Sequence, residues 1–235
     1  MKNIFAIFFL FSFFSLHAQK NVIDTLKTEE LQEVEVNAKR KKINLGFHKK
    51  KVKYSSTNYL DFSKCALFIP SPNIEKSHFI TKICIPIPKK IATTTGICHI
   101  QLYKKSSTGA PGESFLKNKI VVNIDTITGK LISVDIRNQQ LFLPNEGIFV
   151  GLEWPSEGEQ PKKITSNKQV QGPGFSYVFT TTEMLTWWSD IRTGYEWQLL
   201  DRKIAFAEAY YDENTVLNKK KNHPNINYGI VVEVF

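Results

Sequence analysis

Short apolar runs separated by turn residues fill the chain from about residue 54 onward. Within these runs, apolar and polar residues alternate or β-branched residues follow one another. This texture is typical of strands, because successive side chains of an extended chain point to opposite faces of a sheet. We therefore expect strands at residues 65–69, 78–87, 96–103, 119–124, 130–136, 147–154, 175–179, 195–200, 204–210 and 228–235.

The last of these segments alternates most cleanly, with Ile230 and Val232 on one face and Val231 and Glu233 on the other. We expect this strand inside a sheet, so its truncation should unfold the domain. Thr128-Gly129 lies between two expected strands and makes them a hairpin candidate. No window shows a long helical period. The pattern predicts an all-β domain, a jelly-roll-like antiparallel β-sandwich of about 8–10 strands over residues 54–235.

The N-terminus has the features of a secretory signal. Lys2 precedes an almost wholly apolar run at residues 4–16, and Ala18 offers a small residue for cleavage. That run of 13 residues is shorter than the roughly 20 that a membrane-spanning helix needs. Residues 1–18 are therefore expected to be a signal peptide, with Gln19 starting the mature chain. We expect export to the periplasm, the outer membrane or the cell surface, with no transmembrane segment after cleavage.

Residues 19–53 carry few apolar residues and are expected to form a flexible basic linker. Residues 30–38 resemble the TonB-box-like stretch of exported Bacteroidetes proteins, with Leu31, Val34 and Val36 separated by polar residues. An isolated strand of this kind can pair with the sheet edge of a partner. These three residues are candidate partner-binding positions, and an inert linker is the alternative.

The net charge of +9 is concentrated in this linker, and the rest of the chain is close to neutral. Export argues against nucleic acid as the partner. An anionic envelope polymer is the better electrostatic match, and a solvated, self-repelling linker is the alternative. The basic residues of the run are Lys39, Arg40, Lys41, Lys42, Lys49, Lys50, Lys51 and Lys53.

The chain has three cysteines, so not all of them can pair within the molecule. Cys84 and Cys98 lie on strands expected to be neighbours and are candidates for one disulfide in an oxidising compartment. All three, including Cys65, sit among apolar residues, so buried free thiols are the alternative. There is no CxxC and no spacing typical of metal ligands, and we expect neither a metal nor a cofactor.

No catalytic motif is visible: the nucleophile elbow, the HExxH sequence and the phosphate-binding glycine loop are all missing from the sequence. Glu153, between Leu152 and Trp154 on an expected strand, is interpreted as a hydrogen-bonded structural carboxylate. We expect a protein without catalytic activity. A hydrolase whose site assembles only in three dimensions is the alternative.

Aromatic residues offer the best candidate binding site, formed by Trp187, Trp188, Tyr195 and Trp197. Adjacent tryptophans on a strand point to opposite sides, so one is expected in the core and the other in solvent. An exposed ring next to polar groups can stack on a sugar or contact a partner surface. The alternative is that both rings fill the sandwich.

Several segments resemble an uncharacterised exported β-sandwich domain of Bacteroidetes proteins, often found behind a carboxypeptidase-like regulatory domain. The resemblance is carried by residues 100–103, residues 109–113, residues 134–136 and the run from Pro144 to Trp154. It implies a sandwich fold and export, and brings no catalytic residues with it. The function expected from the sequence is a non-catalytic interaction module of the cell envelope that binds an envelope protein or a surface glycan. The alternatives are a carbohydrate-binding sandwich and a cryptic hydrolase.

Overall fold

The computed structural model describes residues 40–50, 54–56, 63–72, 75–87, 93–127, 129–155, 169–171, 175–180, 183–190, 193–200 and 223–235. At 54–56, 93–95, 169–171 and 175 it describes the backbone alone. All of these residues belong to one compact unit, Arg40–Phe235. The expected signal peptide and the TonB-box-like stretch, with Leu31, Val34 and Val36, lie outside the described residues.

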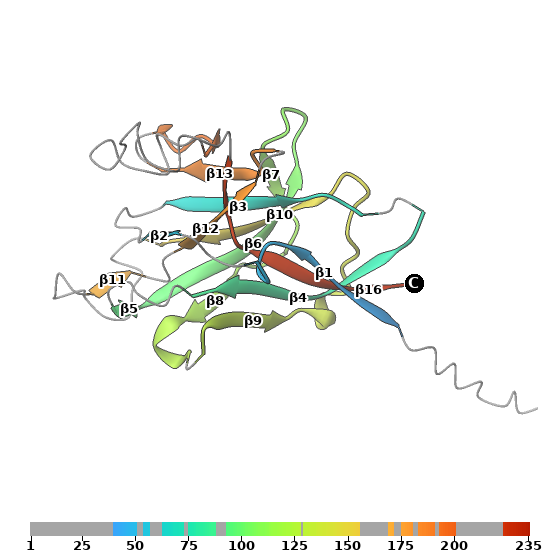
Figure 1. Ribbon diagram of the computed structural model, residues 1–235, viewed down its shortest axis with the longest axis horizontal. Helices are drawn as coiled ribbons and strands as arrows, with labels where there is room; N and C mark the ends of the chain where they lie inside the picture. The colour runs from blue at the N-terminus through green and yellow to red at the C-terminus, as the bar shows by residue number, and fades with distance from the viewer. Residues whose placement is uncertain are drawn as a thin grey trace, which may run out of the picture. The chain divides into compact units, whose positions relative to one another are not determined.

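Strands make up most of the described residues and form mainly antiparallel sheets, which confirms the all-β prediction (Figure 1). In the described part of the chain there is no α-helix, and two short 3₁₀ helices occur at Ile124–Thr126 and Arg137–Gln139. Within the same ranges, no helix has the length and hydrophobicity that a membrane crossing requires.

A four-stranded sheet lies in the lower part of Figure 1, in the order β1-β16-β4-β9, and all of its pairs are antiparallel. The C-terminal strand β16 lies between β1 and β4, as its alternating pattern predicted. The strands are β1 (Lys41–Gly46), β4 (His78–Pro86), β9 (Leu131–Asp135) and β16 (Gly229–Val234).

A seven-stranded sheet lies above it in Figure 1, in the order β14-β13-β3-β10-β6-β7, with β8 also paired to β6. Its centre is β10, which pairs antiparallel with β3 on one side and β6 on the other. The strands are β3 (Lys64–Ile69), β6 (Ile97–Lys105), β7 (Pro111–Ser114), β8 (Ile120–Asn123), β10 (Ile148–Glu153), β13 (Thr186–Ser189) and β14 (Gln198–Leu199).

Two smaller sheets complete the described strands. One has the order β15-β12-β2 and is antiparallel, and the other is a parallel pair of β11 and β5. The strands are β2 (Tyr54–Ser56), β5 (Thr93–Thr95), β11 (Gln169–Gln171), β12 (Phe175–Thr180) and β15 (His223–Ile226).

One hydrophobic core joins side chains from both large sheets. Ile80 and Ile230 of the four-stranded sheet and Leu102 and Val150 of the seven-stranded sheet are fully buried in it. Each such aliphatic side chain contributes about 1.5–3 kcal/mol by leaving water. These residues alternate with outward-facing ones along their strands, so the period-2 pattern is the direct cause of the sandwich.

The folded unit begins earlier than expected, which corrects the linker boundary at residue 53. β1 pairs with β16 along its whole length, from Lys41 opposite Val234 to Gly46 opposite Gly229. Ile43 and Leu45 alternate with polar residues and pack against the core. Sequence reasoning assigned this short alternating segment to the linker because many lysines surround it.

The expected hairpin around Thr128-Gly129 is wrong. β8 pairs with β6 in the seven-stranded sheet, whereas β9 pairs with β4 in the four-stranded sheet. Between them the 3₁₀ helix Ile124–Thr126 begins at Asn123, whose side chain accepts a hydrogen bond from the Asp125 N–H. Ile124 is buried at the point where the chain leaves one sheet for the other. The segment with a turn-like sequence therefore connects two sheets and does not close a hairpin.

The expected Cys84–Cys98 disulfide is also absent, and the thiols of all three cysteines are free and buried. Cys84 lies on β4 opposite Ser133, and Cys98 lies on β6 in the other large sheet. The two strands are close in sequence, with β5 between them, but they belong to different sheets. Burial raises the pKa of Cys65 to about 12, which a partly compensating hydrogen bond with Tyr228 does not prevent. A thiol so far from ionisation is chemically inert.

Candidate binding face of the seven-stranded sheet

The side of the seven-stranded sheet that faces away from the core carries a second apolar layer. Phe149 on β10 is in register with Phe68 on β3 and with Tyr103 on β6, so three rings lie side by side across the central strands. Trp187 of β13 and Trp197 before β14 pack against them. We call these five residues the outer aromatic layer.

The layer arises from the alternation of these strands. The adjacent row of paired residues points to the other face of the sheet. It consists of Leu67, Val150 and Leu102, and all three are fully buried in the main core. Successive side chains point to opposite faces, so the sheet has a core on one side and aromatic rings on the other.

Ring contacts give the layer a fixed geometry. The Phe68 and Phe149 centroids are 5.0 Å apart, and Trp187 meets Phe149 edge-on at 6.5 Å. Trp197 meets Tyr103 edge-on at 5.6 Å. Such pairs each contribute about 0.5–1.5 kcal/mol beyond their buried area, so the rings are ordered before any partner arrives.

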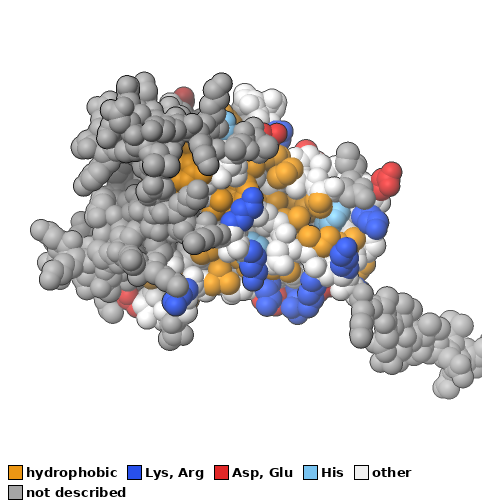
Figure 2. All heavy atoms as spheres, in the orientation of Figure 1, with side chains coloured by type: hydrophobic (Ala, Val, Ile, Leu, Met, Phe, Trp, Pro, Cys, Tyr) orange, Lys and Arg blue, Asp and Glu red, His pale blue; other side chains and the backbone are white. Residues whose placement is uncertain are grey.

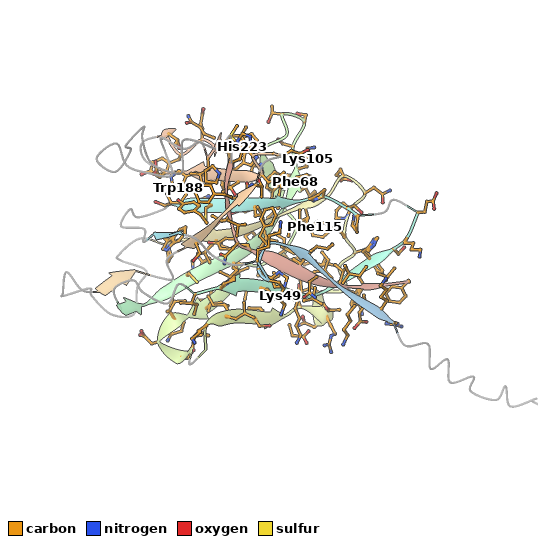
Figure 3. All side chains as sticks on the ribbon, in the orientation of Figure 1. Lys49, Phe68, Lys105, Phe115, Trp188 and His223 are labelled. Carbon is orange, nitrogen blue, oxygen red and sulfur yellow. The ribbon has the colours of Figure 1, made fainter. Side chains whose placement is uncertain are left out.

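A cation borders the layer at Phe68. The Lys105 ammonium lies 4.9 Å from the centroid of the Phe68 ring, and Figure 3 shows the two residues close together. Attraction between an ammonium and a ring face holds the lysine over the aromatic surface. This edge of the layer therefore combines an apolar face with a positive charge.

Gly151 makes room for the Tyr103 side chain. A Cβ atom at Gly151 would lie 2.5 Å from Tyr103 Cε2, closer than packed carbon atoms approach. The Tyr103 ring uses this space to reach along β10, where its hydroxyl donates to Glu153 Oε1. A glycine is thus required between the row of Phe149 and the row of Glu153.

Glu153 is buried and bound to several cations. It accepts from Lys119 Nζ and lies 3.9 Å from Lys64 Nζ. Burial alone would raise the pKa of Glu153, but the bonds from Lys119 and Tyr103 and the charge of Lys64 hold it below its usual value. Burial, and then the Glu153 charge, raises the pKa of Tyr103. An ionised carboxylate with these partners has a structural role, which agrees with the interpretation of Glu153 from the sequence.

The two adjacent tryptophans separate as the strand geometry requires, and Trp188 is the one in the core. It is 4% exposed, packs 6.0 Å from Trp154, and donates its indole N–H to Asp190 Oδ2 at 2.6 Å. The expectation that Trp188 belongs to a binding surface is therefore wrong, because its ring and its donor are both engaged inside the sandwich. Trp187 is half-buried on the outer face.

Tyr195 and Leu199 form the exposed rim beside the layer. Tyr195 is 51% exposed and lies in a turn in which its N–H donates to Asp190 O at 2.8 Å and its carbonyl accepts from Ser189 Oγ at 2.8 Å. Leu199 is 37% exposed and pairs with Trp187 across the β13–β14 ladder. Leu199 therefore lies on the same face as Trp187, and Tyr195 precedes Trp197 by two residues in the turn before β14.

Sequence reasoning missed Phe68, Tyr103 and Phe149. Each lies in a segment that was expected to be a strand, but none was identified as part of a binding site. The available signal was the run itself: where apolar residues fill both alternating positions of a strand, both faces of the sheet must be covered. Over the described ranges, no three His, Cys, Asp or Glu side chains gather as metal ligands.

Comparisons with protein-family models, with curated proteins and with solved structures find no match to this chain. The interpretation of the outer aromatic layer consequently depends on its own geometry and chemistry.

Proposed function

We propose that the protein is an exported, non-catalytic interaction module of the cell envelope that binds a protein partner through the outer aromatic layer and its rim. The observation that carries the proposal is the layer itself. Trp187 and Trp197 are half-buried and pack against the buried rings of Tyr103 and Phe149. The exposed Tyr195 precedes Trp197 by two residues. Residues that dominate protein interfaces are tryptophan, tyrosine and arginine, held rigid in a packed patch.

Export is supported by the signal features of residues 1–18 and by the resemblance to exported Bacteroidetes sandwich domains. A role without catalysis is supported by the state of the ionisable groups on this face. Glu153, Tyr103 and Lys119 bind one another, and an active carboxylate would need a free oxygen facing substrate.

A carbohydrate ligand is the second candidate, favoured by the exposed Tyr195 ring and by the half-buried Trp197 two residues after it. Such rings stack on sugar faces, and the indole N–H offers one polar contact. The same surface would then bind a glycan instead of a protein.

Site-specific photo-cross-linking in envelope fractions tests the proposal. A photoreactive residue at Tyr195 should give a discrete protein adduct, whereas the same residue at Val121 should not. Val121 is 60% exposed on β8 of the same sheet and is the matched control. Trp187→Ala should lower the adduct yield about tenfold, since a central aromatic anchor contributes more than 1 kcal/mol.

A second variant, Leu199→Ser, is needed because Trp187→Ala could lower the adduct yield simply by unfolding the protein. Leu199 pairs with Trp187 and is 37% exposed, so its replacement changes the surface without changing the core. It should weaken the adduct while leaving the melting temperature unchanged. Adducts that are equal at Tyr195 and Val121, or that survive both substitutions, would contradict the proposal. Binding of the purified protein on a glycan panel, lost in Trp187→Ala, would support the carbohydrate alternative instead.

A further inference from the structure

The four-stranded sheet carries a separate group of exposed rings on its outer face. Phe79, Phe142 and Phe235 contact one another, with centroids 5.4, 6.2 and 6.3 Å apart. Phe142 is 50% exposed and Phe235 is 53% exposed. We call these residues the phenylalanine cluster. Phenylalanine has no polar atom in its side chain, so water solvates these rings poorly.

Strand register places the cluster on the side facing away from the core. Phe79 pairs with Glu233 of β16 and forms an isolated bridge to Phe142. The next residues inward along these strands, Ile80 and Val232, are fully buried. The Phe235 N–H donates to Ser77 O at 3.0 Å, which fixes the end of β16 beside the start of β4.

Basic side chains surround the cluster. The Arg40 guanidinium lies 4.2 Å from the centroid of the Phe235 ring, and both Arg40 and Lys42 lie within 4 Å of Glu233, at 3.7 and 3.8 Å. Lys82 lies in the neighbouring row of β4, opposite Val231. Arg40 and Lys42 are both exposed, so their charges are available to a partner.

Positive charge is in excess on this face. Two described carboxylates of its strands are paired, Glu233 with Arg40 and Lys42 and Asp135 with Arg137 at 3.3 Å. Lys49, labelled in Figure 3, lies near enough to Cys84 of β4 for its charge to act on that thiol, as does Lys82. Figure 2 shows blue basic side chains dispersed among orange apolar ones over the region of β1, β16 and β4.

We propose that the phenylalanine cluster and its basic rim bind the surface of an anionic lipid membrane. Exposed rings can enter the boundary between headgroups and acyl chains, and Lys and Arg around them can meet lipid phosphates. Lysine is depleted in protein interfaces but suits diffuse phosphate charge. The mixture of lysines with exposed phenylalanines therefore favours a lipid surface over a protein partner. The proposal rests on the exported location proposed above, but it uses the other large sheet.

Vesicle co-sedimentation tests it. Protein beginning at Gln19 should bind vesicles of phosphatidylglycerol and phosphatidylcholine, bind phosphatidylcholine alone much less, and lose binding as salt rises. Starting at Gln19 removes the apolar run at residues 4–16 and keeps the compact unit Arg40–Phe235 intact. The double variant Phe142→Ser, Phe235→Ser should bind about tenfold more weakly, because it removes two half-exposed rings.

Charge variants give an independent result. Lys42→Gln and Lys82→Gln should each weaken binding about fivefold. The matched controls are Val121→Ser for an exposed apolar residue and Lys117→Gln for an exposed lysine, and both should bind like wild type. Melting curves that match wild type confirm that each variant is folded.

Equal binding to both kinds of vesicle, or wild-type binding by the double phenylalanine variant, would overturn the proposal. So would sedimentation velocity showing that the cluster joins two copies of the chain while vesicle binding persists in the double variant. Trp187→Ala should leave vesicle binding unchanged. A failed cross-linking experiment and a failed vesicle experiment are therefore distinguishable, since each addresses a different sheet.

Discussion

At the scale of single residues, Gly151 explains why positions on two neighbouring strands depend on one another. Its missing side chain makes room for the Tyr103 ring of β6, whose hydroxyl reaches Glu153 on β10. Glu153 in turn binds Lys119. One missing side chain thus supports a network that joins β6, β10 and the segment before β8.

The Glu153 network predicts a pH-dependent contribution to stability. Because the pKa of Glu153 is lowered in the folded state, its contribution is fully present above the unfolded value near 4.5 and is lost as pH falls through the folded value. At neutral pH, Glu153→Gln should cost about 2 kcal/mol. The difference in melting temperature between variant and wild type should narrow below about pH 4.5. Thermal melts from neutral to acidic pH measure this.

Glu146→Gln is the control, because Glu146 is exposed on the loop before β10. It should leave the melting temperature nearly unchanged at every pH. A difference between Glu153→Gln and wild type that stays constant into acid would show that the carboxylate charge is not what stabilises this network.

At the scale of elements, most of the strands that alternation predicted are present, but alternation missed other strands and could not predict which strands pair. β3, β4, β6, β8, β9, β10, β12 and β16 lie where the pattern placed them. Only two residues of the expected strand at 195–200 pair, as β14, and residues 204–210 lie outside the described ranges. Pairing depends on which sheet can bury each apolar face. Thr128-Gly129 has turn chemistry, yet its flanking strands complete opposite sheets.

The central position of β16 predicts very different effects at two adjacent residues. Val232 is fully buried between the sheets, whereas Val231 is half-buried on the outer face. Val232→Ala should lower the free energy of unfolding by about 2 kcal/mol, because it leaves a cavity. Val231→Ala should cost about 0.5 kcal/mol. Chemical denaturation measures both, and equal losses would contradict the assignment of faces.

At the scale of the whole molecule, the division of the strands between two large sheets keeps the thiols of Cys84 and Cys98 apart. It also determines which residues of the candidate site could be identified from the sequence. Cys84 and Cys98 are separated because β4 pairs within the four-stranded sheet and β6 pairs within the seven-stranded sheet. Strand pairing also determines how much of the outer aromatic layer the sequence could reveal. Trp187 and Trp197 were identified from their local clustering, but Tyr103 and Phe149 join them only through strand pairings between distant segments.

Free thiols should persist in protein purified from an oxidising compartment. The native protein should not react with a thiol reagent, since Cys65, Cys84 and Cys98 are all buried, and the denatured protein should react at three positions. Reductant should change neither the intact mass nor the melting temperature. A mass two hydrogens lower before reduction would instead demonstrate a disulfide.

The pairing of β16 with β1 and β4 also sets when this protein can fold. Among the described strands, β1 at the start of the unit pairs with β16, whose residues 229–234 are far from it in sequence. Long-range pairings of this kind form slowly, and a chain still emerging from the ribosome lacks this middle strand until residues 229–234 have been made. The four-stranded sheet therefore cannot be completed before then, so β1 waits for its neighbour while all the strands between them are synthesised.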